Sequence, residues 1–438
     1  MEEFDLCVIG SGPGGIAAAI EASLLGAKVL VIEAKDIGGV CLNRGCIPTK
    51  SYLKSALLYE EFKNSAVFGV SCENINYDFS KIKTRAKDVI NSLRIQAELS
   101  FKARKINIIK GRAAFLSEKR ISVDGKEIGA RAFIIATGSS PKFLNGILAD
   151  NKRIFYSESV LDMGKMPKDI TIVGAGPIGC EFASFFRAFG VDVTLIETLD
   201  RVMPKEDKDI SNKLEGIFRK KGINVLTSVK EVSINKIASE IILISTGRSS
   251  NIKDIGIENA GIKAADGGIS TDEYLRTSSA SIFAAGDCLG KYNLAHTASA
   301  EGRIAARNAL GDKIKMSYEI VPLCVYSFPE TASVGLTAED AAAKGYEVLI
   351  ARQHFASLGR SQTQGETEGF IKLVADKKNG FILGGQILGY CASELIGLIG
   401  MAIKGKFTVK ALAEVIQAHP TLSESVQEAA LNICRQIR

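Results

Sequence analysis

Two cysteines separated by four residues, Cys41 and Cys46, are the first side chains in the sequence that could do chemistry. At this spacing we expect them on successive turns of a helix start, close enough to bridge if their sulfur atoms converge. A bridge across so short a loop would stabilise the fold little, so a reversible redox pair is the better interpretation. The alternatives are two unrelated core thiols or half of a metal site. Zinc pairs usually recur with a second Cys or His pair, and the sequence downstream contains none, so we predict no metal.

A second reactive group lies near the C-terminus, where Glu424 follows His419 by five residues across a proline. A histidine oriented by a carboxylate can move protons near neutral pH. Dithiol oxidation needs such a base because the thiolate is the reactive form of sulfur. The alternative is a surface histidine that precedes a helix.

The first element that could position the cysteines is a glycine turn between an apolar strand predicted over 5–9 and a helix predicted over 16–25. The next strand, over 28–32, ends at Glu33. This order is the context that a dinucleotide-binding fingerprint requires. Its glycines let backbone amides approach a pyrophosphate, and Glu33 can accept hydrogen bonds from ribose hydroxyls. The glycines concerned are Gly10, Gly12, Gly14 and Gly15.

The same pattern recurs, with strands over 169–173 and 192–196, a helix over 180–189 and Glu197 at the end of the second strand. A carboxylate at this position binds a free 2′-hydroxyl and repels a 2′-phosphate, which favours NAD over NADP. Two dinucleotides bound in tandem suggest that electrons pass between them. The glycines of this second turn are Gly174, Gly176 and Gly179.

These motifs, in this order and over essentially the whole chain, resemble the flavin-dependent pyridine nucleotide-disulfide oxidoreductases. The segment 38–50, GGVCLNRGCIPTK, is similar to the redox-disulfide segment of that family. The resemblance implies that FAD occupies the first site and NAD the second, that Cys46 faces the flavin and that Cys41 meets the substrate. Lys50 lies four residues after Cys46, so its ammonium could stabilise charge on a reduced flavin.

The resemblance also implies roles that spacing alone does not establish. Glu181 would pair with Lys50, and His419 would reach the disulfide of the other subunit, so a homodimer is expected. The remaining cofactor contacts implied by the resemblance are Thr137, Gly138, Asp287 and Ala295 for FAD, and Gly247 for NAD.

The activity that the resemblance implies is oxidation of protein-bound dihydrolipoyl groups to lipoyl disulfide, with electrons passing through the Cys41–Cys46 pair and FAD to NAD⁺. The expected partners are lipoyl domains or the acyltransferase core of 2-oxoacid dehydrogenase complexes, or the glycine cleavage carrier protein. Two alternatives stay open. One is an NAD(P)H-dependent reductase of another small disulfide, and the other is a mainly structural flavoprotein subunit of such a complex.

At 438 residues the chain is too long for one hydrophobic core. We predict an α/β fold with two Rossmann-like dinucleotide-binding domains and a C-terminal α+β dimerisation domain. The second nucleotide domain is shortened, because the strand hairpin usual in the family is missing after residue 226. The predicted boundaries are 1–145 for the first part of the FAD domain, 146–250 for the NAD domain, 251–316 for the return segment of the FAD domain and 317–438 for the dimerisation domain.

Composition and charge exclude several other classes of protein. A net charge of +6 without a long basic block does not indicate nucleic-acid binding. The sequence has no apolar run of membrane-spanning length, so we expect no membrane association. The acidic N-terminal residues 1–5 lack the features of a signal peptide, so we expect a cytoplasmic protein.

Overall fold

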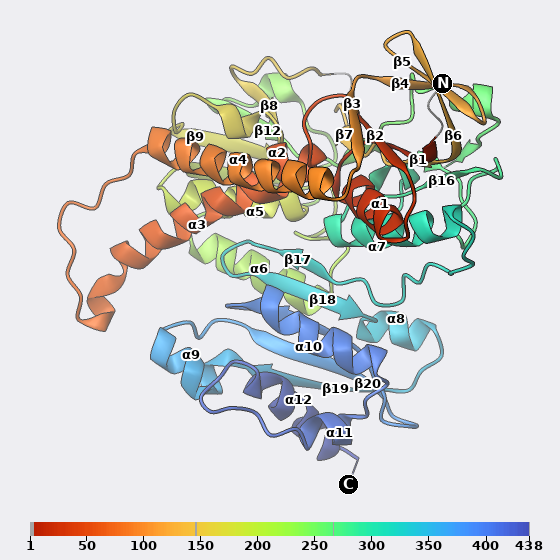
Figure 1. Ribbon diagram of the computed structural model, residues 1–438. Helices are drawn as coiled ribbons and strands as arrows, with labels where there is room; N and C mark the ends of the chain where they lie inside the picture. The colour runs from red at the N-terminus through yellow and green to blue at the C-terminus, as the bar shows by residue number, and fades with distance from the viewer. Residues whose placement is uncertain (1–3, 145–146, 266, 438) are drawn as a thin grey trace. The chain divides into compact units, whose positions relative to one another are not determined.

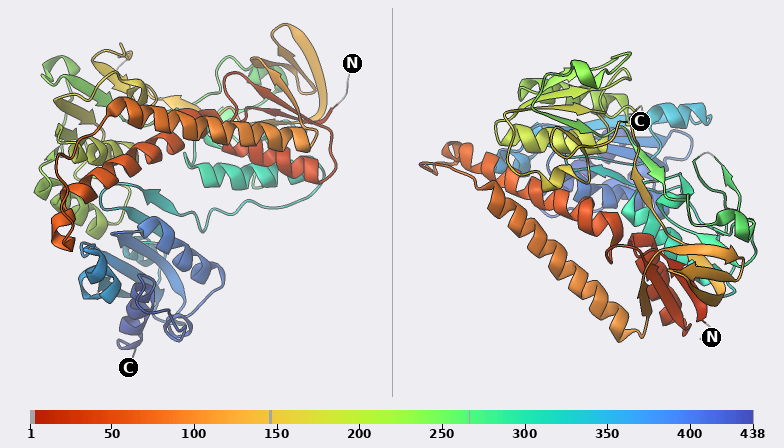
Figure 2. Two further views of the ribbon diagram at one scale, coloured as in Figure 1. Left: turned by 60° about the vertical axis from the view of Figure 1, so that its left-hand side comes forward. Right: turned by 90° about the horizontal axis from the view of Figure 1, so that it is seen from above.

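A computed structural model describes residues 4–144, 147–265 and 267–437. The chain divides into two compact units, one built from residues 1–52, 77–165 and 246–317, and the other from residues 53–76, 166–245 and 318–438. Figures 1 and 2 trace the path of the chain by colour. Residues 1–3 of the predicted acidic N-terminus and the predicted boundary at 145–146 lie outside the described residues.

The first unit contains a sheet in which the parallel strands β3, β2, β1 and β6 lie side by side, and β16 also pairs with β6 in parallel. Strands β1 and β2 are almost wholly buried, as their unbroken apolar sequences predict for a parallel sheet. The N-terminal end of β6 pairs with β5, and β5 pairs with β4, so these three strands form an antiparallel meander. The bounds are β1 (Phe4–Ile9), β2 (Val29–Glu33), β3 (Asn107–Lys110), β4 (Ala113–Ser117), β5 (Arg120–Val123), β6 (Lys126–Ile135) and β16 (Ile282–Ala284).

Helices α1 (Pro13–Leu24) and α7 (Ala295–Ala309) lie side by side in this unit (Figure 1). Glycines make this close packing possible, since a Cβ atom on Gly302 would lie 2.0 Å from the Gly14 carbonyl oxygen. A long helix, α4 (Phe79–Ala103), begins after the N-cap Asp78, which accepts a hydrogen bond from the Lys81 amide. Two further helices, α2 (Gly39–Arg44) and α3 (Cys46–Lys63), follow β2, and α3 runs on into residues of the second unit.

In the second unit, the parallel strands β11, β10, β9 and β12 lie in that order. Between β11 and β12 the fully described chain contains one short helical turn, η3 (Ile234–Lys236), and no strand. This is the segment from which the sequence predicted that a hairpin is missing. The bounds are β9 (Asp169–Val173), α5 (Pro177–Ala188), β10 (Asp192–Ile196), α6 (Lys208–Lys220), β11 (Asn224–Leu226) and β12 (Ile241–Ile244).

The C-terminal part of this unit is an antiparallel sheet in the order β17, β18, β21, β20, β19. Helix α10 packs on β18 and β21, and α12 packs on β19 and β20. The sequence analysis did not predict β18, whose small residues give no strong strand pattern. The bounds are β17 (Leu323–Val325), β18 (Thr331–Gly335), α8 (Ala338–Ala343), β19 (Val348–His354), α9 (Gly359–Gln364), β20 (Phe370–Asp376), β21 (Ile382–Leu388), α10 (Ala392–Lys404), α11 (Val409–Ala413) and α12 (Glu424–Cys434).

The remaining elements are short and lie in connecting segments. They are η1 (Ser65–Phe68), β7 (Ser139–Pro141), β8 (Ile154–Tyr156), η2 (Val160–Asp162), β13 (Arg248–Ser250), η4 (Ile257–Ala260), β14 (Ala264–Ala265), β15 (Gly268–Ile269), η5 (Asp287–Leu289) and η6 (Phe355–Ser357). Within the described part of the chain, each helix is too short or too polar to cross a bilayer.

Candidate active site

The two cysteines lie on two different helices. Cys41 belongs to α2 and Cys46 opens α3, with Gly45 between the helices. The expectation that both lie on one helix start is therefore wrong. A side-chain hydrogen bond nevertheless joins the two cysteines, and both are free thiols in this structure.

The electrostatics of Cys41 also place Lys50 at this pair. The hydrogen bond with Cys46 and then burial raise the pKa of Cys41, whereas the positive charge of Lys50 acts in the opposite direction. Lys50 therefore lies close enough to favour a thiolate at Cys41. The hydrogen bond with Cys46 and burial outweigh this effect, so the pKa of Cys41 in the reduced pair lies well above its usual value.

The loop that carries the cysteines rests directly on the first glycine turn. The Gly38 amide donates to the Ser11 carbonyl oxygen at 2.9 Å. Gly39 has φ +59°, and a Cβ atom there would lie 2.8 Å from the Gly12 Cα atom, so only glycine allows this approach. Asn43 Nδ2 fixes the loop by donating to the Gly39 carbonyl oxygen at 2.8 Å. The loop that carries the redox pair is thus in direct contact with the first dinucleotide turn.

The two glycine turns have the same geometry. Gly10 and Gly174 both have φ +104°. A Cβ atom on Gly15 would lie 1.9 Å from the Gly10 carbonyl oxygen, and one on Gly179 would lie 1.9 Å from that of Gly174. Both turns therefore bring a helix against a strand more closely than any other residue type permits, as a dinucleotide fingerprint does.

Both turns also leave room for a ligand at the start of a helix. Gly12 and Gly176 are the N-caps of α1 and α5. The described residues place no atom within 4 Å of a Cβ built on either glycine. A phosphate fits such a cradle because backbone amides and the helix dipole favour negative charge there.

Glu33 and Glu197 connect each turn to the end of the following strand. Glu33 Oε2 accepts from the Ser11 amide at 2.9 Å, and Glu197 Oε2 accepts from the Ala175 amide at 2.9 Å. The other oxygen of Glu197 accepts from the Thr198 amide at 2.8 Å. These bonds hold both carboxylates beside the glycine turns, where ribose hydroxyls of a dinucleotide would lie.

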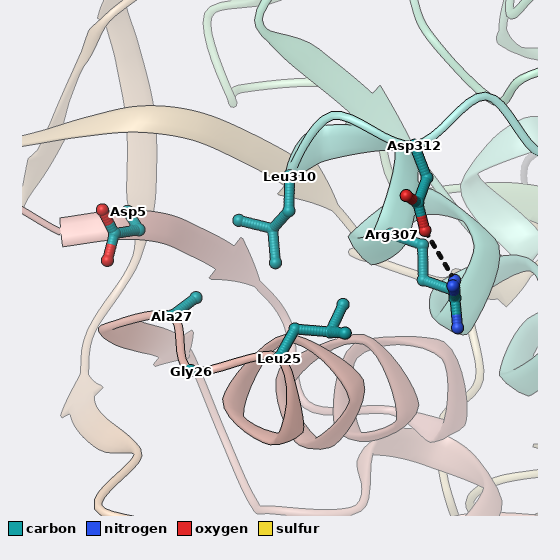
Figure 3. A pocket seen from close by; sticks show the side chains of 7 residues that line it. All are labelled: Asp5, Leu25, Gly26, Ala27, Arg307, Leu310 and Asp312. Atoms are coloured by element: carbon teal, nitrogen blue, oxygen red, sulfur yellow. Dashed lines mark hydrogen bonds and ion pairs between the residues drawn. The ribbon is translucent and has the colours of Figure 1, made fainter.

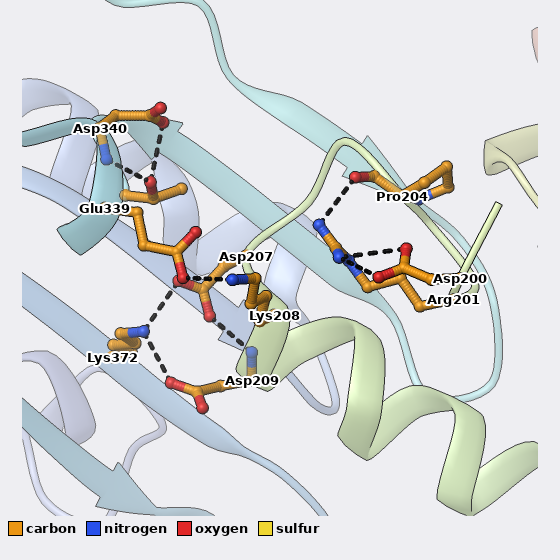
Figure 4. Close-up of polar contacts among 10 residues, drawn as sticks. Asp200, Arg201, Pro204, Asp207, Lys208, Asp209, Glu339, Asp340 and Lys372 are labelled. Carbon is orange, nitrogen blue, oxygen red and sulfur yellow. Dashed lines mark hydrogen bonds and ion pairs between the residues drawn. The ribbon is translucent and has the colours of Figure 1, made fainter. Parts of the chain in front are cut away.

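Arg201, the cation nearest to Glu197 along the sequence, is already engaged. Its Nη1 atom lies 3.0 Å from Asp200 Oδ2, and its Nη2 atom donates to the Pro204 carbonyl oxygen at 3.2 Å (Figure 4). A guanidinium held in this way is less available for a 2′-phosphate, which is consistent with NAD.

Asp287 lies in a polar cluster at the other end of the predicted flavin site. Its Oδ2 atom accepts from Ser139 Oγ at 2.5 Å and lies 4.0 Å from Arg248 Nε. Burial raises the pKa of Asp287, and Ser139 and Arg248 oppose that effect. Asp287 is the first residue of η5, and Gly286 is the N-cap of that turn.

The other residues predicted to contact FAD lie in two neighbouring segments. Thr137 Oγ1 donates to the Asn251 carbonyl oxygen at 2.7 Å, and the Asn251 amide donates to the Gly138 carbonyl oxygen at 2.9 Å. Ala295 begins α7, and two residues later the Thr297 hydroxyl is buried without a hydrogen-bond partner in the described part of the chain. A buried hydroxyl of this kind is expected where a bound ligand supplies the missing partner, so these residues fit a flavin dinucleotide.

Glu181 and Gly247 lie in well-defined positions. Glu181 is a buried residue of α5, and its Oε1 atom accepts from the Tyr326 amide at 3.1 Å. Gly247 has φ +115° and follows β12. The pairing of Glu181 with Lys50 and the contact of Gly247 with NAD stay predictions.

His419 and Glu424 form the predicted pair. His419 Nδ1 lies 2.8 Å from Glu424 Oε1, and Glu424 Oε2 accepts from the Thr421 amide at 2.8 Å. The His419 hydrogen bond and then the Thr421 amide lower the pKa of Glu424. A carboxylate that holds Nδ1–H leaves Nε2 as the proton acceptor of the neutral ring. The His419 side chain is 76% exposed, so it can reach a substrate or a second subunit.

A surface pocket lies elsewhere, at the N-terminal end of β1, whereas Gly10 follows the C-terminal end (Figure 3). Arg307 and Asp312 form an ion pair of 2.8 Å at its edge. This pocket does not coincide with the predicted site. Its lining residues are Asp5, Leu25, Gly26, Ala27, Arg307, Leu310 and Asp312.

The sequence analysis missed the polar residues that surround Asp287 and the cysteine loop. Arg248, which is only 11% exposed, donates from Nε to Ser139 Oγ and from Nη2 to Glu158 Oε1. Glu158 also lies 3.5 Å from Nε of Arg44, one of the four residues between the two cysteines. The position of Arg44 inside the redox segment was the one available signal.

Comparison with known proteins places the chain in a family. Residues 4–302 match the family described as pyridine nucleotide-disulphide oxidoreductase, and residues 321–430 match its dimerisation domain. The chain is 39% identical to a dihydrolipoyl dehydrogenase of Chlorobaculum parvum, covering 98% of this chain and 96% of that protein. It is 37% identical to one of Bacillus subtilis, covering 98% of each.

Solved structures give the same result. The fold matches LpdA from Mycobacterium tuberculosis with a TM-score of 0.92 and 27% identity, covering 99% of this chain and 100% of that one. It also matches a copper(II) complex of the HOCl-induced flavoprotein disulfide reductase RclA from Escherichia coli, with a TM-score of 0.88, 26% identity and coverage of 99% and 100%. The predicted fold class is confirmed, and the chain belongs to the pyridine nucleotide-disulphide oxidoreductase family, which uses FAD and NAD(H).

Proposed function

We propose that this protein oxidises protein-bound dihydrolipoyl groups to lipoyl disulfide and passes the electrons to NAD⁺ through FAD. The observation that supports this most directly is the redox loop, where Cys41 and Cys46 share a hydrogen bond and Gly38 is bonded to the first dinucleotide turn. The relatives named dihydrolipoyl dehydrogenase, at up to 39% identity over nearly the whole chain, support the same substrate.

In the proposed cycle, His419 removes a proton from one substrate thiol while Glu424 holds its ring. The thiolate attacks Cys41 of the oxidised Cys41–Cys46 disulfide, which forms a mixed disulfide and releases the Cys46 thiolate. The second substrate thiol, after losing its proton, attacks the substrate sulfur of that mixed disulfide. Lipoyl disulfide leaves, and the two cysteines keep both electrons. FAD and NAD⁺, when bound, supply the two-electron chemistry that reoxidises the cysteines.

The remaining predicted residues have supporting roles in this proposal. Lys50 favours negative charge at the redox pair, and Glu181 pairs with Lys50. The glycine turns hold the pyrophosphates, while Glu33 and Glu197 bind ribose hydroxyls and Asp287 binds the ribityl chain. We assign FAD to residues 1–145 and 251–316, NAD to the shortened domain 146–250, and dimerisation to residues 317–438.

The proposed assembly is a cytoplasmic homodimer in which His419 of one subunit serves the cysteines of the other. Residues 321–430 match a dimerisation domain, which supports this arrangement. The proposed partners are lipoyl domains or the acyltransferase core of a 2-oxoacid dehydrogenase complex, or the glycine cleavage carrier protein.

A steady-state assay of the purified protein tests the proposal by combining NAD⁺ or NADP⁺ with dihydrolipoamide or glutathione. We expect turnover with NAD⁺ and dihydrolipoamide. Cys46→Ser should keep bound flavin and lose turnover, whereas Cys72→Ser, at an exposed cysteine outside the site, should keep both. Retained turnover in Cys46→Ser would refute the assignment of the redox pair.

The structural likeness to RclA favours a second candidate, an NAD(P)H-dependent reductase of another disulfide. The sequence identity to RclA, 26–27%, is lower than that to the dihydrolipoyl dehydrogenases. NADH oxidation that depends on a small disulfide other than lipoamide, without turnover of dihydrolipoamide, would favour this candidate.

A further inference from the structure

We propose that Glu158 is a positioning residue of the redox site. It fixes the position of the loop between the two cysteines relative to Asp287, through Arg44 on one side and Arg248 on the other. The inference rests on the proposed function, because it assumes a redox pair at Cys41 and Cys46 and FAD beside Asp287. Sequence analysis gave Glu158 no role.

The first half of the connection runs from the cysteine loop to Glu158. Arg44, between the cysteines, lies with Nε 3.5 Å from Glu158 Oε2 and with Nη1 3.0 Å from Asp36 Oδ2. Its side chain is 26% exposed and that of Glu158 is 18% exposed, so both charges are largely removed from water. The guanidinium is thus fixed between two carboxylates, and its position fixes the loop.

The second half runs from Glu158 to Asp287. Glu158 Oε1 accepts from Arg248 Nη2 at 2.9 Å. Arg248 donates from Nε to Ser139 Oγ at 2.7 Å and from Nη2 to the Ser139 carbonyl oxygen at 2.7 Å. Ser139 Oγ in turn donates to Asp287 Oδ2. Each oxygen of Glu158 therefore faces a different arginine. Oε1 accepts a hydrogen bond from Arg248, and Oε2 forms a longer ion pair with Arg44, whose Nε atom has no hydrogen-bond partner in the described part of the chain.

The charge balance explains why a carboxylate is needed at this position. Arg44 and Arg248 both direct positive charge at Glu158, and two partly buried guanidinium groups repel each other unless an anion separates them. An amide has the shape of the carboxylate but not its charge. In Glu158→Gln, Arg44 keeps Asp36 and Arg248 keeps Asp287, but the one carboxylate between the two arginines is lost, so the cysteine loop and Asp287 no longer share a fixed anchor.

The test is a double-mutant cycle on the FAD-loaded enzyme, with the rate of FAD release measured by flavin fluorescence. Arg44→Met changes only the cysteine loop, yet we expect it to accelerate FAD release about tenfold. We expect Glu158→Gln to do the same, and Arg44→Met to add less than about twofold in the Glu158→Gln background. Glu127→Gln is the matched control, because Glu127 pairs with Arg120 at 3.4 Å in the same unit but is 51% exposed. It should leave the rate unchanged.

A second readout does not depend on turnover. The pH profile for alkylation of the reduced cysteines should shift to lower pH in Glu158→Gln, because removing a negative charge near the loop favours the thiolate. In Glu158→Asp, both the rate of FAD release and the alkylation profile should lie closer to those of the wild type than in Glu158→Gln.

Two results would overturn the inference. One is additive effects of Arg44→Met and Glu158→Gln on FAD release, and the other is a Glu158→Gln enzyme with the FAD release and alkylation profile of Glu127→Gln. If Glu158→Gln does not fold, Arg44→Met decides alone, since unchanged FAD release in that variant refutes the connection. A wild-type protein that purifies without FAD would instead refute the proposed function.

Discussion

The buried carboxyl group of Glu206 predicts that this protein loses stability as the pH rises from about 4.5 to about 7. Glu206 lies just before α6 and is 8% exposed. Its Oε1 atom accepts from Ser333 Oγ at 2.9 Å, and its Oε2 atom is buried without a partner in the described part of the chain. The nearby Lys372 is occupied, since its ammonium binds Asp207 at 2.8 Å and Asp209 at 2.6 Å (Figure 4).

Burial raises the pKa of Glu206 from 4.5 to about 7; the Ser333 hydrogen bond opposes the shift and the charge of Asp207 adds to it. Between these two values the folded protein keeps a proton that the unfolded chain has lost. The resulting stabilisation is complete below pH 4.5, and it is lost as the pH rises through 7. At about 1.4 kcal/mol per pH unit, the loss is about 3 kcal/mol.

Glu206→Gln removes this dependence, because the amide keeps the acceptor for Ser333 and cannot ionise. We expect the variant and the wild type to have similar thermal midpoints at pH 5. At pH 8.5 the variant should unfold about 3 to 6 °C higher, the shift expected for about 3 kcal/mol in a cooperative unit of this size. Differential scanning calorimetry across this pH range measures the difference.

The matched control is Glu339→Gln. Glu339 pairs with Lys208 at 3.0 Å and is 66% exposed, so its removal should shift the midpoint little at any pH. A Glu206→Gln variant whose midpoint difference from the wild type does not change with pH would show that Glu206 is ionised in the folded protein at all of these pH values. A variant that is less stable at pH 8.5 would contradict the reasoning outright.

Four further substitutions test the site itself. Gly39→Val places a side chain against Gly12 at φ +59°, so we expect at least a tenfold loss of FAD affinity, measured by flavin absorbance after dialysis. Glu197→Gln removes the charge that opposes a 2′-phosphate, and the ratio of kcat/KM for NADP⁺ to that for NAD⁺ should rise about tenfold. His419→Gln should lower dihydrolipoamide turnover about 10²- to 10⁴-fold without loss of bound FAD. Glu424→Gln should lower turnover less, since it leaves the base in place and removes only its orientation. Unchanged kinetics in both His419→Gln and Glu424→Gln would exclude His419 and Glu424 from proton transfer.

The features that sequence analysis predicted correctly are those set by short stretches of backbone. Each glycine turn spans six residues, and the steric requirement at Gly15 or Gly179 concerns a carbonyl oxygen only five residues earlier in the chain. Glu33 and Glu197 could be identified because one helix and one strand of characteristic length separate each of them from its turn. The strands and helices around both fingerprints followed from apolar runs and helical periodicity for the same reason.

The contacts among the polar residues around Asp287 could not be predicted in this way. Ser139 and Asp287 are 148 residues apart in the sequence, and Glu158 and Arg248 are 90 apart. No period or spacing relates such residues, since the fold alone brings them together. The same holds for the pKa of Glu206, which burial raises and which a hydrogen bond from Ser333, in a distant strand, partly lowers.

The wrong prediction, that one helix start carries both cysteines, has a geometric reason that also bears on their chemistry. Residues five apart on a continuous α-helix point about 140° away from each other, so their sulfur atoms diverge. The break at Gly45 removes this constraint and lets Cys41 and Cys46 share a hydrogen bond. It also leaves Cys46 at the first position of α3, where the helix dipole favours a thiolate, with Lys50 one turn further along. The break between α2 and α3 is thus what the redox pair needs, and a substitution that extends α2 through residue 45 should separate the two sulfur atoms.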